Sequence, residues 1–494
     1  MARETAAFPL LAGYLRRTSV NCFGFGGTNA HAVLDDARSY LEQQKMSAHH
    51  NVAPIASHIH SDSQNGMQSR PRLFIFTAKS RAAVADLVKL HLRYVKASSS
   101  DPAFLRNYEY TLYARRSQLG YSYHVVASTV PEVLQKMEAV SDNKISRAPQ
   151  TKNLQLAYVF CGQGMQWKGM GKTLKGFPVF QESIEAAAKF MGGLARGFDL
   201  LQVLWGHGTD DDIHFPENAQ PSTTAIQIAF VELLRCSGIY PASVVGHSSG
   251  EIAAAFAAGY ISREEAWSLA LCRGLSAARL RNESTLLGGM IAVGLSQAEA
   301  ERYIARVDSN TVCVACINGP RLVTLSGDRE QILILKSILE NHKVFNRLLP
   351  GTVAYHSRHM LAVASSYLGT IRVAPREGDP EHLVKMYSSL TGEIITPDRL
   401  TADYWVRNLV SPVQFEKAVN LMVQDSNPGA FIEISPHSGL GTTLEDIASS
   451  INPRNKIPYL PLSRRGRDEE GFLHVLAFLW SHEQPADLLQ PFEM

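Results

Sequence analysis

The residues best suited to covalent chemistry lie in a short turn, Val244-Val-Gly-His-Ser248-Ser249-Gly-Glu251. An apolar, strand-like run leads into the turn, and an alanine-rich helical pattern follows it. The G-x-S-x-G spacing in this context is typical of a nucleophile elbow, in which small flanking residues allow a strained turn to expose a serine hydroxyl. The sequence therefore predicts Ser248 as a nucleophile at a helix N-terminus, where backbone N–H groups can stabilise an oxyanion.

A serine nucleophile needs a base from elsewhere in the chain, and histidine is the expected one. His356 is the best candidate because it lies where the chain returns to the main sheet after a change of pattern. The alternative is an ordinary surface histidine. His359 is near enough in sequence to compete, whereas His247 should point away from Ser248 by strand alternation and support the turn.

Arg273 is a charged residue on a face that should be buried. Ser262-Arg-Glu-Glu265 has a capping-box pattern, and the helix that it opens has one apolar face, on which Arg273 falls. A guanidinium directed toward a core needs an anionic partner, and its fork fits a carboxylate best. Two partners remain open: a structural pair with Glu251 or another acidic side chain, and the carboxylate of a substrate.

The elements that must position these residues form an α/β pattern. The chain has 494 residues, of which 45% are apolar and 19% charged, enough for about three domains. From residue 153 apolar strands alternate with amphipathic helices, which predicts a mostly parallel sheet. Residues 288–350 change to a strand-helix-strand-strand-helix-strand pattern, which we interpret as an inserted smaller subdomain.

The N-terminal part of the chain divides by composition. Residues 1–36 end in a glycine turn followed by a strand-like run, so no helix N-terminus is available there for a dinucleotide. Residues 37–70 are polar and suit a flexible linker. Residues 71–150 have the pattern of a small α/β unit.

Composition excludes several classes of function. A formal net charge of +2 without a basic stripe argues against nucleic-acid partners. Because the chain has neither a membrane-length apolar run nor a signal-peptide pattern at Met1, and its six cysteines are sparse, we expect a cytosolic protein with no membrane partner. The Cys313-x-x-Cys316 pair reads as two strand cysteines, and the histidines of residues 49–60 lack metal-site spacing, so no metal is expected.

Three motifs together resemble the malonyl and acyl transferase family of fatty acid and polyketide synthases, over about residues 153–470. They are Gly246-His-Ser-Ser-Gly-Glu251, Phe160-Cys-Gly-Gln-Gly-Met-Gln-Trp167 and Ala354-Tyr-His-Ser357. The resemblance implies an α/β fold with an α/β-hydrolase-like parallel-sheet core, an inserted ferredoxin-like subdomain at 288–350 and a preceding α/β linker domain. A C-terminal tail over residues 471–494 would follow.

The resemblance also implies roles for particular residues. Ser248 would carry the acyl group, and His356 would be the general base. The other implied roles belong to Gln163 and Ser249 as oxyanion-hole amides, Arg273 as the group that grips a malonyl carboxylate, Gln220 and Tyr355 as substrate-binding residues, and the backbone carbonyl of Asn408 as the group that orients the imidazole.

The implied reaction moves a malonyl or related acyl group from its CoA thioester to the phosphopantetheine arm of an acyl carrier protein, with no bound cofactor. The alanine and tyrosine before His356 are nearer the pattern associated with malonyl than the one associated with methylmalonyl, although Val353 departs from it. A serine hydrolase or thioesterase is the main alternative, because the same elbow serves both reactions. Arg273 argues against it.

The remaining segments resemble other parts of a fungal-type reducing polyketide synthase. Residues 1–36 are similar to the C-terminal end of a ketosynthase, with His31 at one of its catalytic histidines, and residues 71–150 are similar to the ketosynthase-acyltransferase linker. The ketosynthase nucleophile is not in this chain, so condensation is not expected. A non-catalytic fragment is a further alternative.

Overall fold

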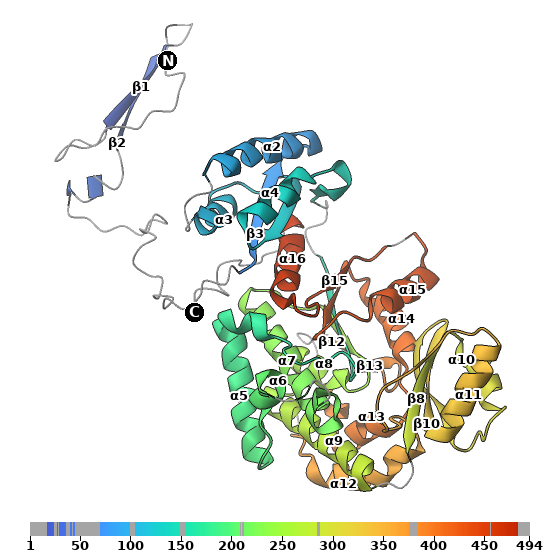
Figure 1. The fold of residues 1–494 in the computed structure, drawn as a ribbon. Helices are drawn as coiled ribbons and strands as arrows, with labels where there is room; N and C mark the ends of the chain where they lie inside the picture. The colour runs from blue at the N-terminus through green and yellow to red at the C-terminus, as the bar shows by residue number, and fades with distance from the viewer. Residues whose placement is uncertain are drawn as a thin grey trace. The chain divides into compact units, whose positions relative to one another are not determined.

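The structure is a computed structural model of the 494-residue chain (Figure 1). It describes residues 17–23, 27, 29–35, 40–41, 43–44, 70–98, 104–148, 154–207, 209, 212–283, 287–374, 384–454 and 456–482. The chain forms two compact units, residues 1–68 and 69–494. The histidine-rich stretch 49–60 and most of the predicted linker 37–70 lie outside the described residues.

The described part of the first unit contains an antiparallel strand pair. Strands β1 (Arg17–Phe23) and β2 (Asn29–Asp35) pair in a register that sets Asn21 opposite His31, whose ring contacts the Asn21 side chain. This confirms that a strand follows the glycine turn. Within this unit the strand side chains are almost all exposed, so the pair buries little apolar surface of its own.

Residues 70–148 form the predicted small α/β unit. Its elements are β3 (Arg72–Ala78), α2 (Arg81–Ser98), α3 (Phe104–Ala114), β4 (Tyr121–Ala127), α4 (Val130–Glu138), η1 (Asp142–Lys144) and β5 (Ser146–Arg147), with the antiparallel order β3-β4-β5. Strand alternation gives β3 two buried faces. Phe74 and Phe76 pack among the helices of this unit, whereas Leu73 and Ile75 belong to the main core.

The C-terminal helix covers the second face of that sheet. Helix α16 (Asp468–Ser481) contacts β3 and β4, and the Trp480 carbonyl accepts a hydrogen bond from the Gln118 side chain. Asp468, which is fully buried at the start of α16, accepts a hydrogen bond from the Gly171 amide at 3.1 Å. Part of the expected tail 471–494 is therefore a packed helix that joins the small unit to the main core.

The main sheet has six strands in the order β13-β12-β7-β6-β14-β15, and every pair is parallel except β12 with β13. The strands are β6 (Leu156–Phe160), β7 (Ser243–Gly246), β12 (Lys385–Ser388), β13 (Glu393–Ile395), β14 (Ala430–Ile434) and β15 (Tyr459–Pro461). Strands β6, β7 and β14 are buried along their whole length, as expected where helices cover both faces. The predicted parallel-sheet core is confirmed.

Helices flank this sheet on both sides (Figure 1). They are α5 (Pro178–Leu194), α6 (Leu200–Trp205), α7 (Pro216–Cys236), α8 (Gly250–Ala257), α9 (Arg263–Glu283), α12 (Leu361–Thr370), α13 (Ala402–Val410), α14 (Phe415–Ser426) and α15 (Gly441–Ile451). Short 3-10 turns are η2 (Lys172–Gly176), η3 (Asp212–His214), η4 (Arg358–Met360) and η5 (Pro397–Arg399).

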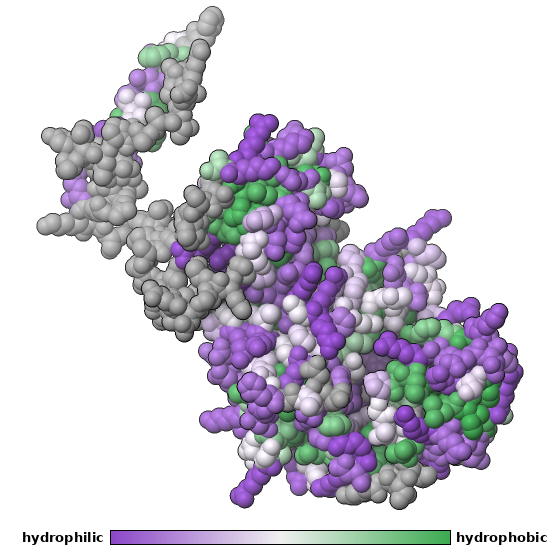
Figure 2. Space-filling view, viewed as in Figure 1, coloured by the Kyte–Doolittle hydropathy of each residue, from purple (hydrophilic) through white to green (hydrophobic). Residues whose placement is uncertain are grey.

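The inserted subdomain has the predicted element order. It comprises β8 (Gly288–Val293), α10 (Gln297–Ile304), β9 (Val312–Gly319), β10 (Leu322–Asp328), α11 (Arg329–Asn341) and β11 (Asn346–Leu348). The antiparallel order β11-β8-β10-β9 is that of a ferredoxin-like unit. Green apolar surface gathers over this subdomain in Figure 2. Among the residues of the subdomain, Leu333, Ile334 and Phe345 are exposed. Its own core lies between the sheet and the two helices.

Glycines allow the turn between β7 and α8 to pack tightly. A Cβ on Gly246 would lie 2.2 Å from the Glu251 amide nitrogen, and one on Gly250 would lie 2.5 Å from the Cys161 carbonyl oxygen. Ser248, between them, has a φ of 53°, in the left-handed region that non-glycine residues rarely adopt. The glycines therefore fix a strained conformation at the predicted nucleophile.

Substitution of Gly250 tests this packing. We expect Gly250→Ala to destabilise the fold by about 2 kcal/mol, because the added methyl group meets backbone rather than a mobile side chain. Gly193→Ala is the matched control, since a Cβ there meets nothing within 4 Å and the residue is helical. Urea unfolding midpoints measure both. Equal midpoints for the two variants would contradict the tight elbow.

Candidate active site

Ser248 lies at the tip of the elbow, immediately before helix α8. Helix α8 begins at Gly250, so its first backbone N–H groups lie next to the serine. Cys161 and Gly162, which follow β6, lie against the elbow: a Cβ on Gly162 would be 2.7 Å from the His247 carbonyl oxygen and 3.4 Å from the Ser248 Cβ. Two adjacent parallel strands thus bring two loops together at the serine.

His356 meets Ser248 directly. The hydroxyl oxygen of Ser248 lies 2.6 Å from Nε2 of His356, across 108 positions of sequence. His356 is 3% exposed and has a φ of 60°, so it too is held in a strained conformation. Burial, helped by the nearby Arg273 charge, lowers the pKa of His356 to about 3. The imidazole is therefore neutral near pH 7 and can accept the serine proton.

The carbonyl that orients this imidazole belongs to Ser411. Nδ1 of His356 lies 2.9 Å from the Ser411 carbonyl oxygen, so Nδ1 carries the proton and Nε2 is free to accept one. The prediction that the Asn408 carbonyl has this role is wrong. Asn408 is inside α13, where carbonyl groups point along the helix axis, whereas Ser411 is the extended C-cap residue. The signal was present in Ser411-Pro412, because a residue before proline favours extended backbone.

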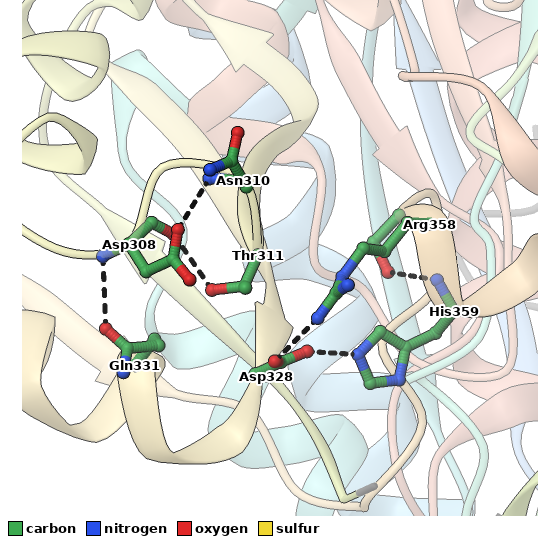
Figure 3. Close-up of polar contacts among 8 residues, drawn as sticks. Asp308, Asn310, Thr311, Asp328, Gln331, Arg358 and His359 are labelled. Carbon is green, nitrogen blue, oxygen red and sulfur yellow. Dashed lines mark hydrogen bonds and ion pairs between the residues drawn. The ribbon is translucent and has the colours of Figure 1, made fainter.

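The two competing histidines are engaged elsewhere. Figure 3 shows that His359 and Arg358 both contact the carboxylate of Asp328. Nε2 of His359 lies 2.6 Å from one carboxylate oxygen, and an Nη nitrogen of Arg358 lies 2.7 Å from the other. His247 directs Nε2 to the Asn318 side-chain oxygen at 2.7 Å, in strand β9 of the small subdomain. His247 therefore links the elbow to the inserted subdomain.

The candidate oxyanion-hole amides belong to the two loops that meet at Ser248. Ser249 is the N-cap of α8, and Gln163 follows Gly162 on the loop that lies against the elbow. Within the described part of the chain, neither backbone N–H donates a hydrogen bond to another residue. Both donors thus remain available for an oxygen that bears developing charge, and their role stays a prediction.

Arg273 is buried beside the nucleophile. It projects from α9, is 1% exposed, and donates from its Nη nitrogens to the Asn408 side-chain oxygen at 2.9 Å and the Ser248 hydroxyl at 3.4 Å. Burial lowers the pKa of Arg273, and its Nε has no hydrogen-bond partner among the described residues. Within those residues no carboxylate lies in ion-pair range, so the structural alternative of a direct pair with Glu251 is not found.

Three further polar residues line the same region. Nε2 of Gln220, in the first turns of α7, lies 3.3 Å from the Gln163 side-chain oxygen and 3.2 Å from the Tyr355 hydroxyl. Burial raises the pKa of Tyr355 to about 12, so its hydroxyl stays protonated. The side-chain oxygen of Gln220 is buried without a partner among the described residues. The predicted residues therefore converge, although their contact with a substrate stays a prediction.

Glu251 is the residue that sequence reasoning undervalued. It is fully buried in the first turn of α8, and its carboxylate accepts hydrogen bonds from the Tyr404 hydroxyl at 2.6 Å and the Asn408 amide at 3.0 Å. A glutamate directly after an elbow glycine, on a helix that is otherwise apolar, was the available signal.

The described segments lack two further kinds of feature. No group of three or more histidine, cysteine or acidic side chains is arranged there to hold a metal ion. No helix in them combines the length and apolar character that crossing a bilayer requires.

Comparison with known proteins identifies relatives of this chain. Residues 157–483 match the acyl transferase domain family, and residues 5–125 match the ketoacyl-synthetase C-terminal extension. The reducing polyketide synthase FUB1 of Gibberella moniliformis is 36% identical over 92% of this chain and 20% of its own length. The highly reducing polyketide synthase sdnO of Sordaria araneosa is 38% identical over 96% of this chain and 15% of its own length. The chain thus spans a fifth or less of these relatives.

Solved structures agree with these matches. The acyltransferase domain from module 8 of the salinomycin polyketide synthase superposes with a TM-score of 0.73 and 25% identity, over 85% of this chain and 98% of that domain. A loading acyltransferase from the avermectin modular polyketide synthase gives a TM-score of 0.60 and 30% identity, over 66% of this chain and 99% of that one. This chain therefore belongs to the acyl transferase domain family, in the form found in polyketide synthases.

Proposed function

We propose that this acyltransferase moves a malonyl group from CoA to the phosphopantetheine thiol of an acyl carrier protein through an acyl-Ser248 intermediate. The observation that carries the proposal is the cluster of Ser248, neutral His356 and Arg273. The serine and imidazole are 2.6 Å apart, and the guanidinium lies 3.4 Å from the same hydroxyl without a carboxylate partner among the described residues.

The first half of the reaction forms the acyl-enzyme. His356 Nε2 takes the Ser248 proton as the serine oxygen bonds to the thioester carbonyl carbon. The amides of Gln163 and Ser249 stabilise the negative oxygen of the tetrahedral intermediate. When the C–S bond breaks, the imidazolium returns the proton to the departing CoA thiol. Because His356 is neutral at the start, no prior deprotonation is needed.

The second half of the reaction transfers the acyl group from Ser248 to the phosphopantetheine thiol by the same steps in reverse. The phosphopantetheine thiol gives its proton to His356 and attacks the ester carbonyl, and Ser248 leaves with that proton. In both halves the Ser411 carbonyl, 2.9 Å from Nδ1, stabilises the imidazolium and keeps its orientation. A neutral carbonyl thus takes the place that a carboxylate has in a serine protease triad.

Arg273 selects the acyl group in this proposal. A malonyl group bound to Ser248 extends a free carboxylate from the ester carbon, and a guanidinium close to the same oxygen can bind it in a bidentate manner. Gln220 and Tyr355 would border the acyl group. A serine hydrolase would have no use for a buried cation reserved for a small acid, which favours the transferase over that alternative.

We also propose that this chain is part of a larger polyketide synthase. The relatives are polyketide synthases several times longer than this chain, and the match of residues 5–125 to the ketoacyl-synthetase extension suggests a neighbouring ketosynthase. We propose that residues 1–36, 71–150 and 153–470 are the ketosynthase end, the linker domain and the acyltransferase domain. The cytosolic location expected from the sequence stays a prediction.

Transfer to a carrier separates the transferase from the hydrolase. With labelled malonyl-CoA and a phosphopantetheinylated carrier protein, we expect the label on the carrier, at a rate that Ser248→Ala reduces by about 10³-fold or more because the nucleophile is lost. Carrier labelling followed by gel or mass detection measures it. Release of free malonate with an unlabelled carrier would identify a hydrolase instead, and transfer that survives Ser248→Ala would exclude this serine as the nucleophile.

The protonation state of His356 gives a pH prediction. Because the imidazole must be neutral and its pKa is lowered to about 3, the rate of Ser248 acylation should stay level as pH falls from about 8 to about 5. An imidazole with an ordinary pKa would lose most of its activity over the same range. Rapid-quench measurement of acylation at saturating malonyl-CoA tests this. A rate that halves near pH 6.5 would show that His356 is not shielded as the structure indicates.

A further inference from the structure

Glu251 is a buried carboxylate that the proposed mechanism does not use. One oxygen accepts hydrogen bonds from the backbone amide and hydroxyl of Ser389 and from the Leu390 amide, the last at 3.1 Å. The other accepts from the Tyr404 hydroxyl at 2.6 Å and the Asn408 amide at 3.0 Å. Burial raises the pKa of Glu251, while these bonds favour the charged form. Three N–H groups that can only donate, together with two hydroxyl groups, surround the carboxylate and favour its ionised form.

Asn408 connects this carboxylate to the reacting groups. Its amide nitrogen also lies 3.2 Å from the Ser248 carbonyl oxygen, and its side-chain oxygen accepts a hydrogen bond from Arg273 at 2.9 Å. A guanidinium can only donate, and an ionised carboxylate or a carbonyl can only accept. The orientation of the Asn408 amide is therefore fixed by its partners: nitrogen toward Glu251, oxygen toward Arg273.

This arrangement holds the cation without neutralising it. An amide oxygen aligns the Arg273 guanidinium, whereas a carboxylate in the same place would form an ion pair and compete with a substrate carboxylate. Glu251 does not contact Arg273: its hydrogen bond goes to Asn408, and its charge acts on the guanidinium from beyond that amide. The guanidinium thus keeps its charge and its direction, with one Nη nitrogen at Ser248.

We propose that Glu251, acting through Asn408, is the positioning residue that directs Arg273 toward the acyl group on Ser248 and so sets the selectivity for acyl groups with a free carboxylate. This inference rests on the proposed function, in which Arg273 binds that carboxylate. Neither Glu251 nor Asn408 touches the acyl group. Their contribution is the orientation of the guanidinium.

The test is the ratio of malonyl to acetyl loading when the protein is exposed to an equimolar mixture of malonyl-CoA and acetyl-CoA. Intact-protein mass spectrometry reports both adducts in one sample. In Glu251→Gln the oxygen that accepts three hydrogen bonds should remain an oxygen, so the new NH₂ faces Asn408. Asn408 must then turn its own NH₂ toward Arg273. We expect the ratio to fall roughly tenfold or more, because a charge-assisted hydrogen bond is lost.

Two further variants test whether a fall in the ratio for Glu251→Gln comes from misfolding or from an effect that does not involve Arg273. Asn408→Ala removes the oxygen that aligns Arg273, and we expect a similar fall in the ratio. Arg273→Ala should give the largest fall. Adding Glu251→Gln to Arg273→Ala should lower the ratio no further, because the two residues act through one contact. An additional fall in the double variant would contradict the inference.

Glu433→Gln is the matched control. Glu433 is also fully buried, at the end of β14, and accepts hydrogen bonds from the Ser435 hydroxyl at 2.7 Å, the amides of Gly439 and Leu440, and the Tyr459 hydroxyl. It has no hydrogen bond to Asn408 or Arg273 among the described residues. We expect a lower unfolding midpoint with a ratio equal to that of the unsubstituted protein.

The results for these variants distinguish failure of the positioning role of Glu251 from failure of the carboxylate-binding role of Arg273. If Arg273→Ala leaves the ratio unchanged, the proposed carboxylate role fails, and the inference fails with it. If Arg273→Ala lowers the ratio while folded Glu251→Gln and Asn408→Ala retain the original ratio, the function stands and the positioning role is wrong. If Glu433→Gln lowers the ratio as much as Glu251→Gln does, loss of any buried carboxylate is enough, and the specific role of Glu251 is refuted.

Discussion

The charge of Arg273 is buried 3.4 Å from the hydroxyl of Ser248, and the surrounding structure holds it there without neutralising it. Placing a guanidinium out of water is costly unless hydrogen bonds and an anion compensate. Here the compensation is divided: Asn408 and Tyr367 supply hydrogen bonds, and Glu251 supplies a negative charge that does not contact the guanidinium. This division leaves a full positive charge facing the place where a substrate carboxylate would lie. The same charge lowers the pKa of His356 and helps keep the imidazole neutral, as the proposed mechanism requires.

The fold explains how residues from distant parts of the sequence converge on this point. Parallel strands β6 and β7 end at the same edge of the sheet, which brings the loop after β6 against the elbow. The inserted subdomain leads the chain back to His356 and also supports the elbow through Asn318. Helix α13 then contributes twice, with Asn408 from its interior and the Ser411 carbonyl from its C-cap. Because α13 contacts both the base and the cation, a shift of this one helix would disturb both groups.

Much of this could be predicted from the sequence, because the patterns were local. The elbow around Ser248, the parallel core and the element order of the insertion each depend on residues close together in the chain, and the structure confirms these elements. The buried position of Arg273 also followed from helix periodicity. The error lay in a local detail: two carbonyl groups three residues apart, in Asn408 and Ser411, differ in direction because the helix ends between them. The donors of the Glu251 network were harder to predict, since they come from the turn after β12 and from α13.

The position of the acyl group on the protein is the most direct test of these conclusions. The protein would be exposed briefly to malonyl-CoA without a carrier and quenched, and the mass of its peptides would then locate the adduct. The mechanism predicts one malonyl group on the peptide that contains Ser248, with little adduct when His356→Ala removes the base. A malonyl group on another residue, such as Cys313 beside the site, or full labelling of the His356→Ala variant, would contradict the mechanism.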